Sequence, residues 1–268
     1  MNTPRIEQTF SWDGFVRTGI APEALAHGAA AIGYAGVELA PPETWSLIRD
    51  HGLRIISLTG HPLAPAGLND PAQFPAIESS IHRALEQAQA WRIPYVLCFS
   101  GNRRGIPPDE AAEITAEHLR RLTPACAEAD VTLVLELLNS KSADRDYEAD
   151  HTAWGARVCD LVNDRRVRLL YDIFHMQIME GDLIRTIRTY APVIGHYHTA
   201  GNPGRHDLDE AQEIGYPAVV RAIAETGHSG FIGHEFFPKH DALTSLRHAY
   251  ELVEAALAAA GPDGASPG

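Results

Sequence analysis

The chain has 268 residues, 45% of them hydrophobic and 21% charged, so it is long enough to bury a sizeable core. Its 22 Lys and Arg residues stand against 35 Asp and Glu residues, giving a net charge of −13. This charge repels phosphate backbones and anionic membrane surfaces, which argues against nucleic-acid and membrane partners.

The cysteines and the first residues of the chain indicate a cytoplasmic protein. The three cysteines lie far apart and form no CxxC pair, which is unlike a disulfide framework or a zinc–thiolate site. Arg5 and Glu7 fall where a secretion signal would need an apolar core, and the sequence has no run of 18 apolar residues. A homo-oligomer is compatible with this composition.

Apolar strand-like runs alternate with longer helix-like stretches along the whole chain, as expected for βα units with a parallel sheet. Proline and acidic residues mark helix starts, for example before the predicted helices 111–130 and 218–226, and Gly33, Gly52 and Gly227 mark helix ends. The eight predicted strands are Ile6–Trp12, Gly36–Leu39, Arg54–Thr59, Tyr95–Ser100, Thr132–Leu137, Arg168–Ile173, Ile194–Thr199 and Phe231–Phe236.

This alternation favours a single (β/α)8 TIM barrel over residues 1–260. The strands recur at roughly thirty to forty residues without a linker or a shift in composition, and one such barrel needs about 250 residues. A doubly wound open sheet is the alternative. Residues 261–268, with their glycines and prolines, are predicted to be a disordered tail.

Four successive predicted strands end in an ionisable residue. Glu136 closes the fifth strand, Asp172 the sixth, His198 the seventh and Glu235 the eighth. In a TIM barrel the catalytic face lies at the carboxyl ends of the strands, so these side chains can converge there.

Three carboxylates and one imidazole would repel one another in a pocket unless a cation lay between them, which predicts a divalent metal site. Mostly oxygen ligands with one nitrogen suit Mg²⁺ or Mn²⁺. For each residue alone, a helix cap or a salt bridge is the ordinary alternative. That alternative would need four separate explanations for four adjacent strands, whereas one metal site explains all four.

Further candidate residues lie close to the same strand ends. His175 follows Asp172 by three residues and would either contact substrate or cap the next helix. His61 and Glu38 close the third and second strands, where either would line the pocket, and His61 is a candidate substrate-binding residue. Glu38 is equally suited to pair with a basic residue inside the barrel. Arg205, in a Gly/Pro-rich loop, is a predicted clamp for a substrate carboxylate or hydroxyl, with a surface arginine as the alternative.

These residues also carry a family likeness. The chain resembles the hydroxypyruvate isomerase family of the xylose isomerase-like TIM barrels, most strongly between Leu133 and Pro238. The matching segments are Glu136–Asn139, Tyr171–Gly181, His198–Arg205, Gln212–Tyr216 and Gly233–Glu235.

The resemblance implies a divalent metal held by Glu136, Asp172, His198 and Glu235, with the two glutamates also acting as proton acceptor and donor. It implies that His175 and Arg205 hold substrate oxygens. The ligand on the seventh strand is often glutamine in hydroxypyruvate isomerases proper, whereas His198 matches the ketose 3-epimerases of the same superfamily.

Isomerising an α-hydroxy carbonyl compound requires removal and return of a carbon-bound proton, with a metal stabilising the enediolate. For hydroxypyruvate the product would be tartronate semialdehyde, and for a ketose it would be the C3 epimer. The predicted partner is therefore a small keto acid or ketose. Two rival interpretations are an abasic-site endonuclease, which the net charge opposes, and a non-catalytic sugar-binding module, which the presence of both glutamates opposes.

Overall fold

Strands and helices alternate along the chain in the computed structural model, which describes residues 6–63, 65–142 and 145–260. Within these residues, eight parallel strands form a closed barrel whose order follows the sequence from β1 to β8. This confirms the predicted (β/α)8 fold. Residues 261–268, predicted to be a disordered tail, lie outside the described residues.

The chain divides into two compact units. The first unit contains the described residues up to Ile55, then Asp182–Pro192, and those from Tyr197 on; the second contains Ile56–Gly181 and Val193–His196. That residues 1–260 behave as one domain stays a prediction. The strands are β1 (Glu7–Ser11), β2 (Gly36–Glu38), β3 (Arg54–Thr59), β4 (Tyr95–Cys98), β5 (Thr132–Glu136), β6 (Val167–Asp172), β7 (Ile194–Thr199) and β8 (Phe231–His234).

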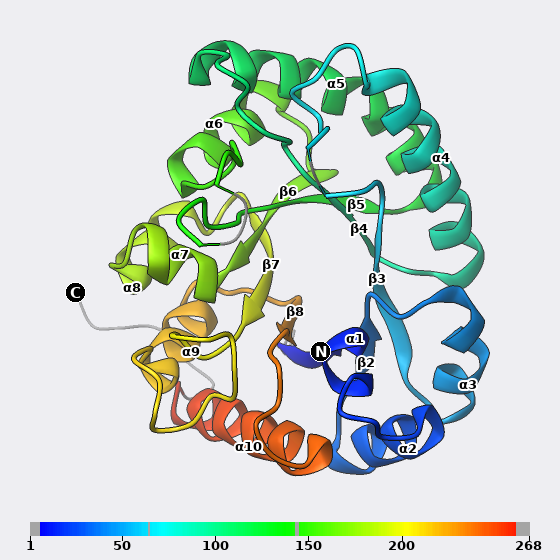
Figure 1. Ribbon diagram of the computed structural model, residues 1–268, viewed down its shortest axis with the longest axis vertical. Coiled ribbons are helices and arrows are strands. Elements are labelled where there is room, and N and C mark those ends of the chain that lie inside the picture. Colours follow the sequence, from blue (N-terminus) through cyan, green and yellow to red (C-terminus); the bar gives the residue numbers. More distant parts are fainter. Residues whose placement is uncertain (1–5, 64, 143–144, 261–268) are drawn as a thin grey trace. The chain divides into compact units, whose positions relative to one another are not determined.

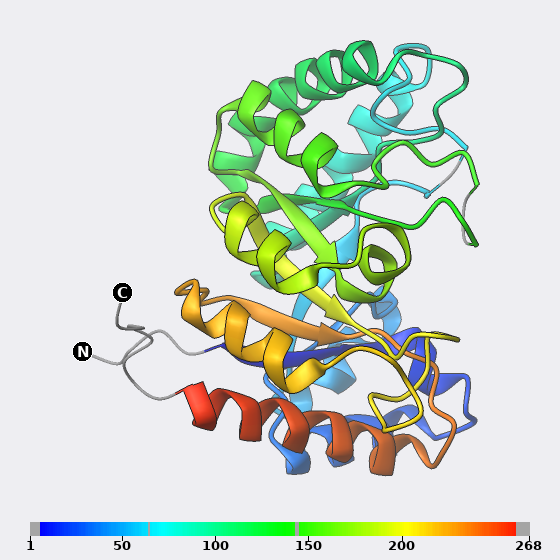
Figure 2. The same cartoon turned by 90° about the vertical axis from the view of Figure 1, so that its left-hand side faces the viewer.

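In the first unit β1 pairs with both β2 and β8, and β8 pairs with the end of β7. Helices α9 and α10 cover the outer side of β1 and β8 (Figure 2). Phe10, Phe15, Tyr34 and Phe236 form an aromatic cluster with ring centroids 5.1–5.4 Å apart. The helical elements of this unit are α1 (Trp12–Val16), α2 (Pro22–Ile32), η1 (Pro42–Thr44), α3 (Trp45–Asp50), α8 (Leu183–Tyr190), α9 (Tyr216–Glu225) and α10 (Ala242–Ala260).

In the second unit β3, β4, β5 and β6 pair in sequence order, and helices flank them (Figure 1). Helix α4 buries Phe74, Ile77, Ile81 and Leu85, a spacing that places them on one face of the helix. Helix α4 packs against β4 and against helix α5. The helices of this unit are α4 (Phe74–Trp91), α5 (Pro108–Ala129), α6 (Thr152–Val162) and α7 (Ile173–Met179).

The predicted strands match the observed ones in order; the bounds of β3 and β7 are the predicted ones, and those of the other strands differ by one or two residues at one or both ends. The first strand was predicted to reach Trp12, but helix α1 begins there and the indole is buried. Helix α2 ends at Gly33 as predicted, with φ of 120°, a conformation that favours glycine.

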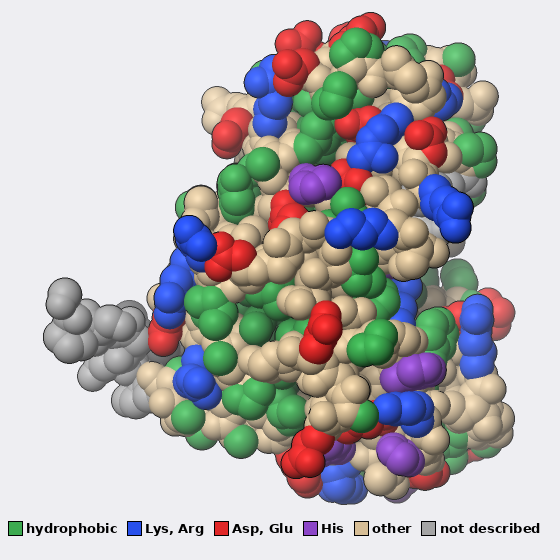
Figure 3. Space-filling view, turned by 60° about the vertical axis from the view of Figure 1, so that its left-hand side comes forward, with side chains coloured by type: hydrophobic (Ala, Val, Ile, Leu, Met, Phe, Trp, Pro, Cys, Tyr) green, Lys and Arg blue, Asp and Glu red, His purple; other side chains and the backbone are tan. Residues whose placement is uncertain are grey.

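The described chain contains three free cysteines, Cys98, Cys126 and Cys159, all buried. None of the described helices combines the length and apolar character needed to cross a membrane. On the face shown in Figure 3, Asp and Glu side chains are interspersed with Lys and Arg side chains.

Candidate metal centre

Two of the four predicted metal ligands lie in the second unit, at the ends of neighbouring strands. Glu136 ends β5 and Asp172 ends β6, and the two strands pair in parallel register. Both side chains are buried, and carboxylate oxygens of the two residues lie within 4.8 Å of one another. Two buried like charges at this separation need a proton or a cation between them.

The end of β6 is shaped by a helix cap. Asp172 is the N-cap of α7, and its Oδ1 accepts a hydrogen bond from the backbone N–H of His175 at 3.2 Å. This bond satisfies an amide group that the first turn of a helix otherwise leaves exposed, and it fixes the carboxylate at the strand end. Asp172 therefore caps the helix, a role that the sequence had left open for His175.

His175 is buried beside Asp172, and its ring orientation is set by backbone contacts. Its Nδ1 accepts a hydrogen bond from the backbone N–H of Asn139 at 3.0 Å. The ring hydrogen is then on Nε2, which lies 3.6 Å from Asp172 Oδ2. An N–H held in this direction is suited to donate to a substrate oxygen, and that role stays a prediction.

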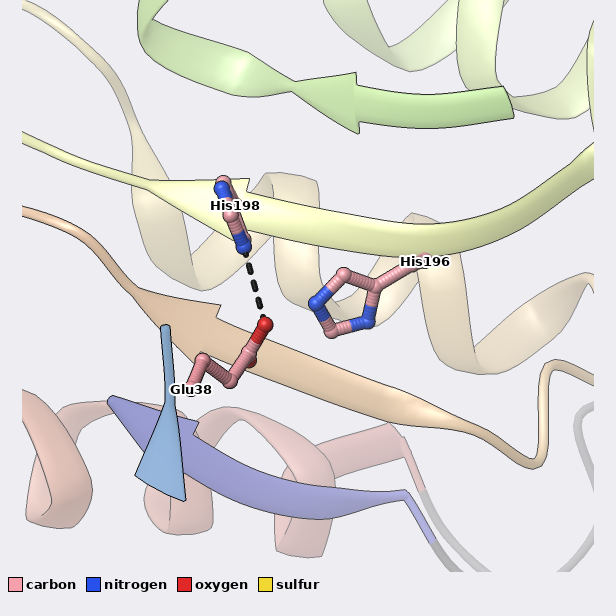
Figure 4. Close-up of side chains that lie close together, drawn as sticks. All are labelled: Glu38, His196 and His198. Carbon is pink, nitrogen blue, oxygen red and sulfur yellow. Dashed lines mark hydrogen bonds and ion pairs between the residues drawn. The ribbon is translucent and has the colours of Figure 1, made fainter. Parts of the chain in front are cut away.

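The other two predicted ligands lie in the first unit and contact each other directly. His198 is on β7, and its Nδ1 lies 2.9 Å from Oε2 of Glu235, which directly follows β8. On its other side, His198 Nε2 lies 3.1 Å from Oε2 of Glu38 at the end of β2 (Figure 4). His198 and Glu38 are almost wholly buried. The basic partner suggested for Glu38 is thus His198.

Arg205 forms an ion pair with Glu235. Its Nη2 donates to Glu235 Oε2 at 2.7 Å, and its backbone has φ of 58°. Arg205 and Glu235 both line a pocket of about 250 Å³ in the first unit. The guanidinium therefore faces a cavity beside a predicted ligand, which is not the environment of an ordinary surface arginine. The remaining lining residues are Ser11, Asp13, Gly14, Leu39, Phe236 and Phe237.

His61, predicted to bind substrate, has both ring nitrogens occupied by backbone groups. Its Nδ1 donates to the carbonyl of Pro62 at 2.9 Å, and its Nε2 accepts from the N–H of Phe99 at 3.1 Å. Burial lowers the pKa of His61 to about 4, so the ring is neutral at pH 7. Substrate binding by His61 stays a prediction, and it would have to use the carbon edge of the ring.

A second buried histidine escaped the sequence analysis. His234 ends β8, with Nδ1 2.7 Å from Thr199 Oγ1 and Nε2 2.9 Å from Gln8 Oε1. Burial, the largest cause, lowers its pKa to about 3. The signal that could have found it is its place beside Glu235 in an otherwise apolar strand. Its partner Gln8 is 226 residues away in the sequence, which no local pattern reveals.

The donor chemistry of both units fits a divalent cation. The second unit supplies two buried carboxylates, and the first supplies an imidazole in contact with a carboxylate. Oxygen-rich sets with one nitrogen suit Mg²⁺ and Mn²⁺, and the absence of thiolates among these residues is unlike a structural zinc site.

Comparison with known proteins places the chain in a family. A human protein that carries a provisional name as a hydroxypyruvate isomerase is 28% identical over 258 residues, which span 90% of this chain and 92% of the human one. The model of the family described as "Xylose isomerase-like TIM barrel" matches residues 27–255.

Solved structures agree in fold. The crystal structure of AP endonuclease, family 2, from Brucella melitensis has a TM-score of 0.80 at 22% identity, over 90% of this chain and 97% of that one. D-allulose 3-epimerase from Methylomonas sp., in complex with D-allulose, has a TM-score of 0.75 at 20% identity, over 94% and 97%. The family likeness found in the strand-end residues is thus confirmed, and the chain belongs to the xylose isomerase-like TIM barrel family.

Proposed function

We propose that the protein is a metal-dependent isomerase of a small α-hydroxy carbonyl compound, with hydroxypyruvate as the first candidate substrate. The observation that carries the proposal is the buried pair Glu136 and Asp172, whose oxygens lie within 4.8 Å of one another, an arrangement that a divalent cation would stabilise. The similarity to the human protein provisionally named as a hydroxypyruvate isomerase supports the choice of reaction.

The proposed ligands are Glu136, Asp172, His198 and Glu235. Each lies at or next to the carboxyl end of its strand, on β5, β6, β7 and β8, which are consecutive in the closed parallel barrel. A bound Mg²⁺ or Mn²⁺ would supply Lewis-acid polarisation of the substrate carbonyl.

The protein's own residues would move the proton and hold the substrate. One of Glu136 and Glu235 would take the proton from C3 of hydroxypyruvate, and the other would return a proton to C2, while the hydroxyl proton passes from the oxygen on C3 to the oxygen on C2, giving tartronate semialdehyde. Arg205, at the wall of the 250 Å³ pocket, would orient the carboxylate of the substrate. His175, with its N–H directed by the bond at Nδ1, would donate to a substrate oxygen.

A ketose 3-epimerase is the second candidate function, favoured by one residue. The seventh strand carries His198, the residue type of the ketose 3-epimerases, where hydroxypyruvate isomerases often carry glutamine. In that reaction the same pair of glutamates would exchange the proton at C3 of the sugar.

The test is a proton-exchange screen by ¹H NMR in deuterated water. Hydroxypyruvate, four-carbon keto acids and common ketoses are incubated with the protein and Mg²⁺, and in parallel with EDTA. We expect loss of one carbon-bound proton signal that depends on Mg²⁺ and is fastest for hydroxypyruvate. Exchange confined to C3 of a ketose would select the epimerase. Exchange with none of these compounds, or cleavage of abasic-site DNA, would overturn the proposal.

A further inference from the structure

Glu38 is a buried carboxylate that the proposed reaction does not use. It ends β2, has no exposed surface, and contacts two groups of the first unit. The hydroxyl of Thr9 donates to its Oε1, and its Oε2 lies 3.1 Å from His198 Nε2. A carboxylate removed from water in this way is costly unless its partners compensate it, so the arrangement calls for a specific reason.

The contact with His198 bears on which ring nitrogen can bind a metal. A neutral imidazole carries one N–H, and a carboxylate can only accept. Carboxylates face both ring nitrogens of His198, with Glu235 2.9 Å from Nδ1 and Glu38 3.1 Å from Nε2. A metal held by Glu235 and Nδ1 would need the lone pair of Nδ1, which leaves the N–H on Nε2 to donate to Glu38. Histidines that bind metals commonly donate their other N–H to a carboxylate, which fixes the ring and raises its basicity as a ligand.

Gly233 provides an independent sign that the fold makes room for this pair. It lies opposite Thr9 on one side of β8 and opposite His198 on the other. A Cβ atom at Gly233 would overlap Oε1 of Glu38 and would lie 3.0 Å from Cδ2 of His198. Any larger residue would therefore displace the carboxylate from the ring, whereas its backbone has no positive φ that would require glycine by itself.

We propose that Glu38 is a positioning residue that accepts the Nε2–H of His198 and so presents the lone pair of Nδ1, on the side of Glu235, to the metal ion. This inference rests on the proposed function, because it takes His198 as a metal ligand. The hydroxyl of Thr9 donates to Oε1 of Glu38, and the missing side chain at Gly233 leaves space for the same carboxylate.

A purely structural role for the Glu38–His198 contact would give a different result. If Glu38 and His198 only filled the interior, replacing Glu38 would lower stability but leave the ring nitrogen that faces Glu235 unchanged. A positioning role predicts that the tautomer of His198 and the metal affinity change together. These two readouts need no turnover.

The experiment compares four variants with the wild type after removal of metal. Glu38→Gln keeps the shape; with its amide oxygen facing Thr9, its NH₂ group faces His198 Nε2 and favours the opposite tautomer. Gly233→Ala displaces the carboxylate and keeps both charged groups. The matched controls are Glu43→Gln, at an exposed carboxylate, and Gly215→Ala, where an added methyl group meets nothing within 4 Å.

Mn²⁺ affinity is measured by calorimetry, and the His198 tautomer by ¹⁵N NMR of the metal-free protein. We expect Glu38→Gln and Gly233→Ala to bind Mn²⁺ roughly 10–100-fold more weakly, with a shifted ¹⁵N signature, and both controls to match the wild type. Circular dichroism confirms that each variant is folded.

The outcomes separate the two proposals. A wild type that binds no Mn²⁺ overturns the proposed metal site. A wild type that binds Mn²⁺, with Glu38→Gln binding within about twofold of it and an unchanged tautomer, overturns only the role of Glu38. If Glu38→Gln does not fold, Gly233→Ala and Thr9→Val decide the question, and unchanged Mn²⁺ affinity in both contradicts the inference.

Discussion

The interior of the barrel strands differs between the two units. In the second unit a buried run precedes each carboxylate, Leu133–Leu135 before Glu136 in β5 and Leu169–Tyr171 before Asp172 in β6. In the first unit, His198 on β7 and His234 at the end of β8 are both buried. The carboxylates of the second unit therefore depend on a strand end and a helix cap, whereas His198 in the first unit belongs to a hydrogen-bonded network.

The two halves of the proposed ligand set are therefore organised differently. Glu136 and Asp172 are like charges held close together, an arrangement that favours a cation. His198 already has Glu38 and Glu235 on its two nitrogens, so its position is fixed by protein groups. We expect the first unit to lose more stability than the second when a ligand is removed.

The largest expected effect is removal of one ligand from each unit. Asp172→Ala and His198→Ala should each abolish Mn²⁺ binding and isomerase activity together. Without metal, His198→Ala should cost about 3–5 kcal/mol of unfolding free energy, because it takes the ring away from two carboxylates. Asp172→Ala should cost only about 1 kcal/mol, the value of a helix cap, because it also relieves the repulsion of Glu136.

Urea unfolding in EDTA measures both free energies, and calorimetry measures the metal. Glu43→Ala, at an exposed carboxylate, is the control for each measurement. Equal losses of unfolding free energy in Asp172→Ala and His198→Ala would contradict the expectation that the first unit depends more on its ligand. Retained Mn²⁺ binding in either variant would remove that residue from the ligand set.

The next largest effect is expected from the two glutamates, one in each unit. Glu136→Gln and Glu235→Gln keep the side-chain shape and one oxygen ligand but remove the base, so kcat should fall by roughly 10²–10⁴-fold. Deuterium exchange measured from each direction of the reaction should show that the two variants fail at different proton transfers. Near-normal turnover of both variants with metal bound would leave the glutamates as ligands only.

The fold and the ligand candidates could be predicted from sequence because local patterns carry them. An apolar run closed by one carboxylate, as at Glu136 and Asp172, is visible without any knowledge of distant residues. The network around His198 was not visible, because Glu38 is 160 residues away and Gln8, the partner of His234, is 226 residues away. The start of α1 at Trp12 was missed because a buried indole suits a strand and a helix equally.

A third prediction concerns His61, a buried histidine of the second unit. Its pKa of about 4 in the folded protein lies below the ordinary value of 6.5, because burial disfavours the charged ring. The unfolded chain binds a proton below pH 6.5 while the folded protein does not, so the contribution is present above pH 6.5 and is lost as pH falls toward 4. The loss should reach about 3 kcal/mol at pH 4.

Urea unfolding between pH 7 and pH 4 measures this loss. In His61→Gln the amide oxygen can still accept from the N–H of Phe99, but the side chain does not titrate. This variant should therefore lose about 3 kcal/mol less than the wild type over the same range. Identical pH dependence of the two proteins would show that His61 does not contribute.

The smallest expected effect is that of Arg205→Lys, which tests whether the guanidinium beside Glu235 binds the substrate. Arg205 donates to Glu235 at 2.7 Å and lines the 250 Å³ pocket. Lysine keeps the positive charge but loses the planar fork that can hold two oxygens at once. KM should rise roughly tenfold, equivalent to about 1.4 kcal/mol, with kcat changed less, because the lost contact holds the substrate in both ground and transition states. Arg205→Ala should raise KM further.

Arg188→Lys is the matched control, because Arg188 makes a similar pair with Glu225 at 2.6 Å but is exposed and does not line the pocket. Steady-state kinetics with an anionic keto acid and with a neutral ketose sharpen the result. A guanidinium that binds a substrate carboxylate should matter more for the keto acid, because a charged partner strengthens the hydrogen bonds that lysine cannot reproduce. A guanidinium whose main role is to hold Glu235 should instead lower kcat for both substrates by the same factor. Unchanged KM and kcat in both Arg205 variants would leave the ion pair with Glu235 as a local contact without a part in substrate binding.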